Sequence, residues 1–210
     1  MKKKGLIIIA VLAVLLVIMQ ILVNVGKSPA KMSDKNLTVV TAPDQDEAME
    51  NEQFKVEEYK SPEIKGTNVA IGAIASDNGY TDVYPASQAV DGRRESSSYW
   101  EGPSDKDESI LTVNLKKAYN IHTIRIGLNP DSLWGPRTQT LSVSVSEDGK
   151  KYTELVPSKD YDFDPNTGNE IILNDFKEVK AQYVKVTITK NTGAKGGQIA
   201  ELEVYSNDKK

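Results

Sequence analysis

Cysteine is absent from all 210 residues, and histidine occurs once, at His122. Disulfide frameworks, thiolate metal sites and cysteine nucleophiles are therefore excluded, and a multi-histidine metal site has too few ligands. The 26 Lys and Arg residues stand against 30 Asp and Glu, so no basic excess is available to neutralise phosphates and no nucleic-acid partner is expected. Secreted eukaryotic domains of this size usually carry disulfides, so their absence favours a bacterial protein.

Sequence motifs of catalysis are also missing. There is no G-x-S-x-G elbow, no H-E-x-x-H helix and no glycine-rich phosphate loop in the chain. A glycosidase would need two carboxylates facing each other across a cleft, and spacing in the sequence does not establish such a pair. We therefore predict that the protein is not an enzyme.

An uninterrupted apolar stretch runs from Leu6 to Val23, with Gln20 its only polar residue, and three lysines precede it. About 20 residues in a helix span the hydrocarbon core of a bilayer. Because positive charge holds a terminus in the cytoplasm, residues 1–26 are predicted to be a signal anchor with the rest of the chain outside the cell. The alternative is a cleaved signal peptide ending near residues 28–30 (SPA).

Residues 27–66 are expected to form a disordered, acidic linker. They contain a cluster of seven carboxylates between Asp44 and Glu58 and few large apolar residues. Such a composition buries too little surface to offset the entropy of ordering.

Residues 67–210 show the alternation of apolar and polar residues that is typical of half-buried strands. In residues 141–145 (LSVSV) one face is aliphatic and the other is serine. The clearest predicted strands are Ser109–Leu115, Thr123–Leu128, Leu141–Ser146, Tyr183–Thr189 and Ile199–Tyr205. About eight strands with a single short helical turn at Pro85–Val90 predict an all-β, antiparallel sandwich.

Five fragments of this region, in order, resemble the discoidin (coagulation factor 5/8 type C) domain and carbohydrate-binding module family 32. They are residues 68–70 (NVA), 84–92 (YPASQAVDG) followed by Trp100, 146–152 (SEDGKKY), 181–186 (AQYVKV) and 200–205 (AELEVY). The resemblance implies a discoidin-type jelly roll that binds its ligand through loops at one end. Residues 134–141 (WGPRTQTL) are similar to modules attached to bacterial polysaccharide-degrading enzymes, which implies a glucan-type ligand.

The resemblance also implies a structural calcium ion. The family's ligands correspond to Asp91, Ser98 and Glu201 of this chain, with backbone carbonyls completing the oxygen shell. The segment after Gly92 is about two residues longer than is usual, so Ser96 is an alternative to Ser98. A turn without metal, in which Arg93 and Arg94 neutralise the carboxylates, is the competing interpretation. A second acidic run, residues 160–166 (DYDFDPN), lacks the glycine of an EF-hand loop and is predicted to be a strand leading into a turn.

Loop residues suited to a sugar lie around Trp134. Lectin sites combine an aromatic face with planar or charged hydrogen-bonding groups on rigidly held loops. The residues predicted to contact the ligand are Trp134, Arg137, Asn129, Tyr80 and Gln198. The alternative is that Trp134 covers the core and Arg137 pairs with an acidic neighbour.

The sequence thus predicts a bacterial, single-pass membrane protein whose extracellular domain binds a polysaccharide or cell-wall glycan without catalysis. The alternative is an envelope scaffold that uses the same sandwich to bind a protein. Phospholipid binding is the third possibility, and the polar, acidic loops argue against it.

Overall fold

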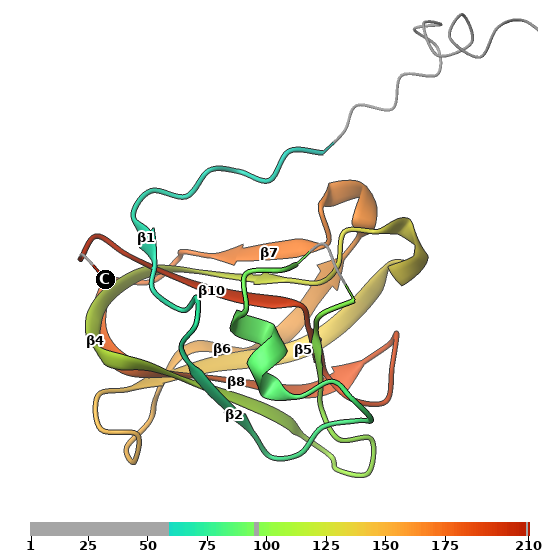
Figure 1. Ribbon diagram of the computed structural model, residues 1–210, viewed down its shortest axis with the longest axis horizontal. Helices are drawn as coiled ribbons and strands as arrows, with labels where there is room; N and C mark the ends of the chain where they lie inside the picture. The colour runs from blue at the N-terminus through green and yellow to red at the C-terminus, as the bar shows by residue number, and fades with distance from the viewer. Residues whose placement is uncertain (1–58, 95–96, 209) are drawn as a thin grey trace, which may run out of the picture. The chain divides into compact units, whose positions relative to one another are not determined.

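The computed structural model describes residues 59–94, 97–208 and 210 (Figure 1). The predicted anchor and most of the predicted linker lie outside these residues. Within the described part of the chain, no helix is long and apolar enough to cross a membrane. Residues 59–66, which we call the arm, are described and belong to the same compact unit as the sandwich.

The described residues form an antiparallel β-sandwich with almost no helix. Its strands are β1 (Thr67–Asn68), β2 (Ile74–Asp77), β3 (Trp100–Glu101), β4 (Ser109–Gly127), β5 (Arg137–Ser146), β6 (Thr153–Phe163), β7 (Glu170–Leu173), β8 (Val179–Asn191), β9 (Gln198–Ile199) and β10 (Glu201–Ser206). Three 3-10 turns join them, namely η2 (Ala86–Val90), η3 (Ser132–Trp134) and η4 (Pro165–Thr167). The predicted all-β class and the short turn near Pro85 are confirmed.

Strand β4 takes part in both layers of the sandwich (Figure 1). Its first half pairs with β2 and β8, and its second half pairs with β10 and β7. The pairing with β8 shifts between Asn114 and Tyr119, where Lys116 adopts a φ of 72°. Such an irregularity bends a strand and increases its twist. The two strands predicted at 109–115 and 123–128 are therefore one bent strand.

The remaining strands extend the two layers from β4. On one side β8 is followed by β5 and then by β6, and on the other side β10 is followed by β1. Strands β3 and β9 form a separate ladder of two strands. The predicted strand 141–146 is the second part of β5, and its pattern holds, because its aliphatic side chains are buried while Ser142 and Ser144 are only half-buried.

One apolar core fills the space between the layers. Its largest fully buried side chains include Trp100, Phe163, Ile126, Ile188 and Leu202. The second predicted acidic run becomes the end of β6 and the turn η4, so the interpretation as a strand leading into a turn is confirmed.

Burial in the core predicts that substitutions of two isoleucines in strands will differ in their effect on the free energy of unfolding. Ile126 is 0% exposed and Ile74 is 58% exposed. We expect Ile126→Ala to lower the free energy of unfolding by about 2–5 kcal/mol, because it removes buried methylene groups and leaves a cavity. Ile74→Ala should change it by less than about 0.5 kcal/mol. Urea unfolding of the two variants measures the difference, and equal losses would contradict this placement of the core.

Candidate functional site

Three aromatic rings gather where η3, β3 and the loop before η2 meet. The rings of Tyr84 and Tyr99 stack with centroids 4.1 Å apart and an interplanar angle of 22°. Trp134 meets Tyr99 edge to face, with centroids 4.7 Å apart and an angle of 86°. Trp134 is half-buried and packs against the core, so one part of its indole supports the fold while another part is accessible.

Arg137, the first residue of β5, lies over the Trp134 ring, with its guanidinium carbon 5.0 Å from the ring centroid. The guanidinium also donates to the side-chain oxygen of Gln198 and, at 3.4 Å, to the carbonyl of Gly135. Among the described residues, no carboxylate lies within ion-pair distance of Arg137. Partial burial lowers the pKa of Arg137, and the nearby charge of Glu101 opposes this effect.

Gln198 links the guanidinium to a carboxylate. Its amide nitrogen donates to Glu101 Oε2 at 2.8 Å, and Asn191 Nδ2 approaches its oxygen at 3.3 Å. Gln198 and Glu101 are partners in the β3–β9 ladder, so the backbone pairing fixes their distance. Burial raises the pKa of Tyr99, and a hydrogen bond to Tyr84 and the charge of Glu101 raise it further. The result is one group in which the aromatic face, the guanidinium and the carboxylate are half-buried and the Gln198 amide is buried.

The structure brings three of the five predicted ligand residues together, namely Trp134, Arg137 and Gln198. Tyr80 is 52% exposed in a neighbouring loop, which is held to β3 by the bond from Thr81 N to Glu101 O at 2.9 Å. Asn129 is buried, and its side-chain oxygen accepts from Asp131 N at 2.8 Å, so it shapes the loop. Whether any of them binds a ligand stays a prediction.

The sequence reasoning did not select Tyr84, Tyr99 and Glu101. Tyr84 opens the fragment 84–92, and the other two flank Trp100, so each stands beside a residue that was selected. The signal was therefore present, but the contacts of these residues with the Trp134 loop are formed only in the folded chain.

The residues predicted to bind calcium also lie near one another. Ser98 Oγ donates to Asp91 Oδ2 at 2.6 Å, and Gly92 N donates to Glu201 Oε2 at 3.0 Å. Arg93 contacts Asp91 at 3.3 Å, whereas Arg94 turns away to Glu170. The alternative ligand, Ser96, lies outside the described residues.

Glu201 gives a direct test of whether this place suits a cation. It is only 3% exposed, and its second carboxylate oxygen, Oε1, is buried without a hydrogen-bond partner among the described residues. Burial raises the pKa of Glu201 to about 8, and the charge of Asp91 adds to this effect. Within the described part of the chain, no three acidic or histidine side chains form a metal cluster. A cation would therefore rely on Asp91 and Glu201 together with hydroxyl and carbonyl oxygens, a donor set that suits calcium.

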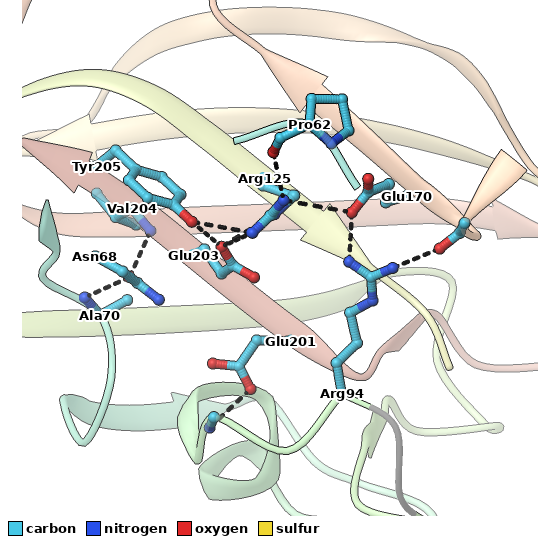
Figure 2. A network of polar contacts seen from close by, with 12 residues as sticks. Pro62, Asn68, Ala70, Arg94, Arg125, Glu170, Glu201, Glu203, Val204 and Tyr205 are labelled. Carbon is cyan, nitrogen blue, oxygen red and sulfur yellow. Dashed lines mark hydrogen bonds and ion pairs between the residues drawn. The ribbon is translucent and has the colours of Figure 1, made fainter. Parts of the chain in front are cut away.

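A network of charges joins the arm to the sandwich (Figure 2). Glu170, at the start of β7, has a side chain only 1% exposed and forms ion pairs with Arg94 and, at 3.7 Å, with Arg125. Arg125 also pairs with Glu203 at 2.6 Å. Burial alone would lower the pKa of Arg125, but the hydrogen bond and charge of Glu203 raise it.

The arm contacts this network at two points. Tyr59 donates its hydroxyl to Glu170 Oε1 at 3.0 Å. Arg125 donates to the carbonyl of Pro62 at 3.3 Å, as Figure 2 shows. Arg94 completes the junction with a bond of 2.6 Å to the carbonyl of Gly168. The predicted boundary at residue 67 stays a prediction, although the structure shows that residues before it contact the domain.

When the chain is compared with models of known protein families, one family matches. The model of the F5/8 type C domain matches residues 70–202, well over half of the chain. No curated protein matches the chain.

Solved structures share the fold. They include the family 32 carbohydrate-binding module of Clostridium perfringens NanJ in complex with galactose, at 22% identity and a TM-score of 0.56, covering 67% of this chain and 98% of that one. Chitosan-binding module 1 of a chitosanase/glucanase from Paenibacillus sp. IK-5 has 22% identity and a TM-score of 0.52, covering 67% and 99%. The family 32 module of AlyQ in complex with 4,5-unsaturated mannuronic acid has 18% identity and a TM-score of 0.52, covering 68% and 98%.

The buried charge network predicts a large effect of removing Glu170. In Glu170→Ala the guanidinium groups of Arg94 and Arg125 lose a buried partner, so the free energy of unfolding should fall by about 3–5 kcal/mol. The matched control is Glu147→Ala, whose pair with Lys180 is exposed on both sides and should contribute at most about 1 kcal/mol. Chemical unfolding measures both, and equal small losses would contradict the assigned role of Glu170.

Proposed function

The chain belongs to the F5/8 type C domain family, and we propose that it is a non-catalytic protein that binds a polysaccharide or cell-wall glycan. One observation carries the proposal: the group around Trp134 and Arg137. It presents an aromatic face beside a guanidinium, an amide and a carboxylate that already hold one another in place. A sugar has an apolar C–H face surrounded by hydroxyls, and this group offers partners to both.

Each residue has a separate part in the proposed binding. The accessible face of Trp134 packs on the apolar face of a sugar ring. Arg137 donates hydrogen bonds to the hydroxyl oxygens and Glu101 accepts one from a hydroxyl. Gln198 is only 6% exposed, and its part is to hold the guanidinium and the carboxylate in place. Because the four side chains are already fixed by their mutual contacts, little side-chain entropy is lost on binding.

We assign no catalysis to this group. Glycoside hydrolysis needs two carboxyl groups on opposite sides of the scissile bond. Glu101 is the carboxylate that joins the Trp134 group, and its Oε2 already accepts from Gln198. With one shallow site, affinity in the micromolar to millimolar range is expected.

The ligand class rests on the related modules. The resemblance implied a glucan-type polymer, and one of the similar structures is a chitosan-binding module from a chitosanase/glucanase, which adds an amino-sugar polymer as a candidate. Residues 6–23 support attachment to the cell membrane, with the sandwich on the extracellular side. Many copies held in one membrane would bind a polymer with higher avidity than a single copy.

A second candidate function is protein binding on the cell envelope. The observation in its favour is that Leu133 is 92% and Val83 is 63% exposed. Each directly precedes one of the three clustered aromatic residues. Exposed apolar side chains of this kind occur at protein interfaces. The experiment on Trp134 below distinguishes the two functions.

We also propose that a structural calcium ion is held by Asp91, Glu201 and the hydroxyl of Ser98. Calcium would supply positive charge to the buried, unpartnered oxygen of Glu201 and favour the ionised carboxylate. Asp91 follows η2, Ser98 precedes β3 and Glu201 begins β10, so the ion would connect these three elements.

Removal of the aromatic face tests sugar binding. Trp134→Ala should weaken retention on chitosan or an insoluble glucan by at least about 30-fold, the effect expected for a central contact residue. Tyr152→Ala is the control, because it removes a ring beside the far end of β5, roughly 30 Å away along the strand. Binding assays on polysaccharides measure both variants, with thermal unfolding to check folding. A folded wild-type chain that no polysaccharide retains would favour the protein-binding function.

Calcium removal tests the metal site. Excess calcium should raise the unfolding temperature of the wild type relative to a chelator, since a ligand at 100 times its Kd stabilises the native state by about 2.7 kcal/mol. Glu201→Gln should abolish this difference, whereas Glu147→Gln, at an exposed position, should retain it. Calorimetry in calcium and in chelator measures the shift, and identical melting of the wild type in both would exclude the proposed ion.

A further inference from the structure

A cleft of about 450 Å³ lies beside the first residues of the loop that carries Trp134. Its lining comes from the arm, from the start of the Trp134 loop, from η4 and from one arginine, namely Tyr59, Ser61, Asn129, Pro130, Asp131, Pro165, Gly168 and Arg94. Its size falls in the range of small-molecule sites, roughly 300–1,000 Å³. None of the residues predicted from the sequence to bind the ligand, apart from Asn129, touches it.

We infer that this cleft is a second binding site for the same glycan, and that the arm forms one of its walls. The inference rests on the proposed function. It means that the ligand is an internal stretch of a polymer that crosses the loop from Trp134 to Tyr59, rather than a single terminal sugar.

The chemistry of the cleft resembles that of the first site. The ring of Tyr59, which is 39% exposed, provides an aromatic wall, and Pro130 and Pro165 provide rigid apolar surfaces. Asp131 uses one carboxylate oxygen to accept from Leu133 N at 2.8 Å, and its other oxygen has no partner among the described residues. The hydroxyl of Ser61 is likewise without a described partner. Sugar hydroxyls can therefore find both acceptors and a donor here.

The cleft is fixed in shape. Tyr59 is held by its bond to Glu170, and its ring lies so close to Gly168 that a Cβ there would stand 2.0 Å from it. Glu170 is in turn held by Arg94 and Arg125. A ring that is positioned before the ligand arrives costs little entropy when it binds.

The two sites are close enough for one polysaccharide molecule to contact both. Trp134 N donates to Asp131 O at 3.0 Å, so the wall of the cleft and the indole are the two ends of one 3-10 turn. Three residues of such a helix rise roughly 6 Å, a distance that neighbouring sugar units of one polymer can cover.

The test compares oligosaccharides of two lengths on the full chain. We expect a chito- or gluco-hexasaccharide to bind about tenfold more tightly than the disaccharide in calorimetric titration. Tyr59→Ala should abolish this ratio and leave the disaccharide Kd unchanged. Tyr59→Phe keeps the ring but loses the bond to Glu170, so it should reduce the ratio only in part. Lys60→Ala is the matched control, because it alters an exposed arm residue that does not line the cleft.

The possible failures differ. A wild type that binds both lengths equally, or a Tyr59→Ala variant that keeps the ratio, would overturn the second site and leave the proposed function intact. A wild type that binds neither length of either sugar, while unfolding cooperatively, would overturn both.

Discussion

Strand β4 forms hydrogen bonds with a neighbouring strand on each of its two edges, and it does so in both layers of the sandwich. The rest of the fold depends on this pairing. The first half of β4 holds β2 and β8, and its second half holds β10 and β7. The bend at Lys116 allows one strand to take part in both layers. The registers of the neighbouring strands are therefore set by their pairing with the same strand. Because a slip of one residue would exchange buried and exposed faces, this register is strongly specified.

The buried charges follow from that placement. Arg125 is in the second half of β4, where it lies between Glu203 of β10 and Glu170 of β7 (Figure 2). Removing charged groups from water is costly, and such pairs add little net stability compared with apolar residues of the same size. Their value here is geometric, because Glu170 accepts from Tyr59 and thereby fixes where the arm joins the sandwich.

Sequence reasoning succeeded where the signal is local. The alternation in residues 141–145 predicted a strand because burial on one face imposes a period of two. Sequence reasoning failed at Lys116–Lys117, where it predicted a break between two strands and the structure has an irregularity within one. A bulge and a turn have similar local sequences, so the sequence does not distinguish them. Trp134, Arg137 and Gln198 were selected from the residue types of their loops, after the family resemblance implied binding by loops at one end, and the structure brings them into contact.

Other parts of the site were beyond such reasoning for a physical reason. Glu101 reaches Gln198 only because β3 pairs with β9 across 97 residues of chain. Tyr59 was assigned to a disordered linker because its neighbours are acidic and polar, and composition does not reveal a partner such as Glu170 that lies 111 residues away. Long-range pairs of this kind depend on the completed topology.

The same topology explains how the proposed binding surface is held in place although it consists of loops. Three residues are each held by a contact near the end of a strand. Trp134 contacts the guanidinium of Arg137 at the start of β5, and Gln198 pairs with Glu101 in the β3–β9 ladder. Tyr59 donates a hydrogen bond to Glu170, the first residue of β7. A weak ligand such as a neutral sugar offers few strong contacts, so a site that had to order itself on binding would lose most of its affinity to entropy. If the protein binds a glycan as proposed, the cross-links among these side chains would hold the contact groups in place before the ligand arrives, in addition to the stability that the apolar core gives the sandwich.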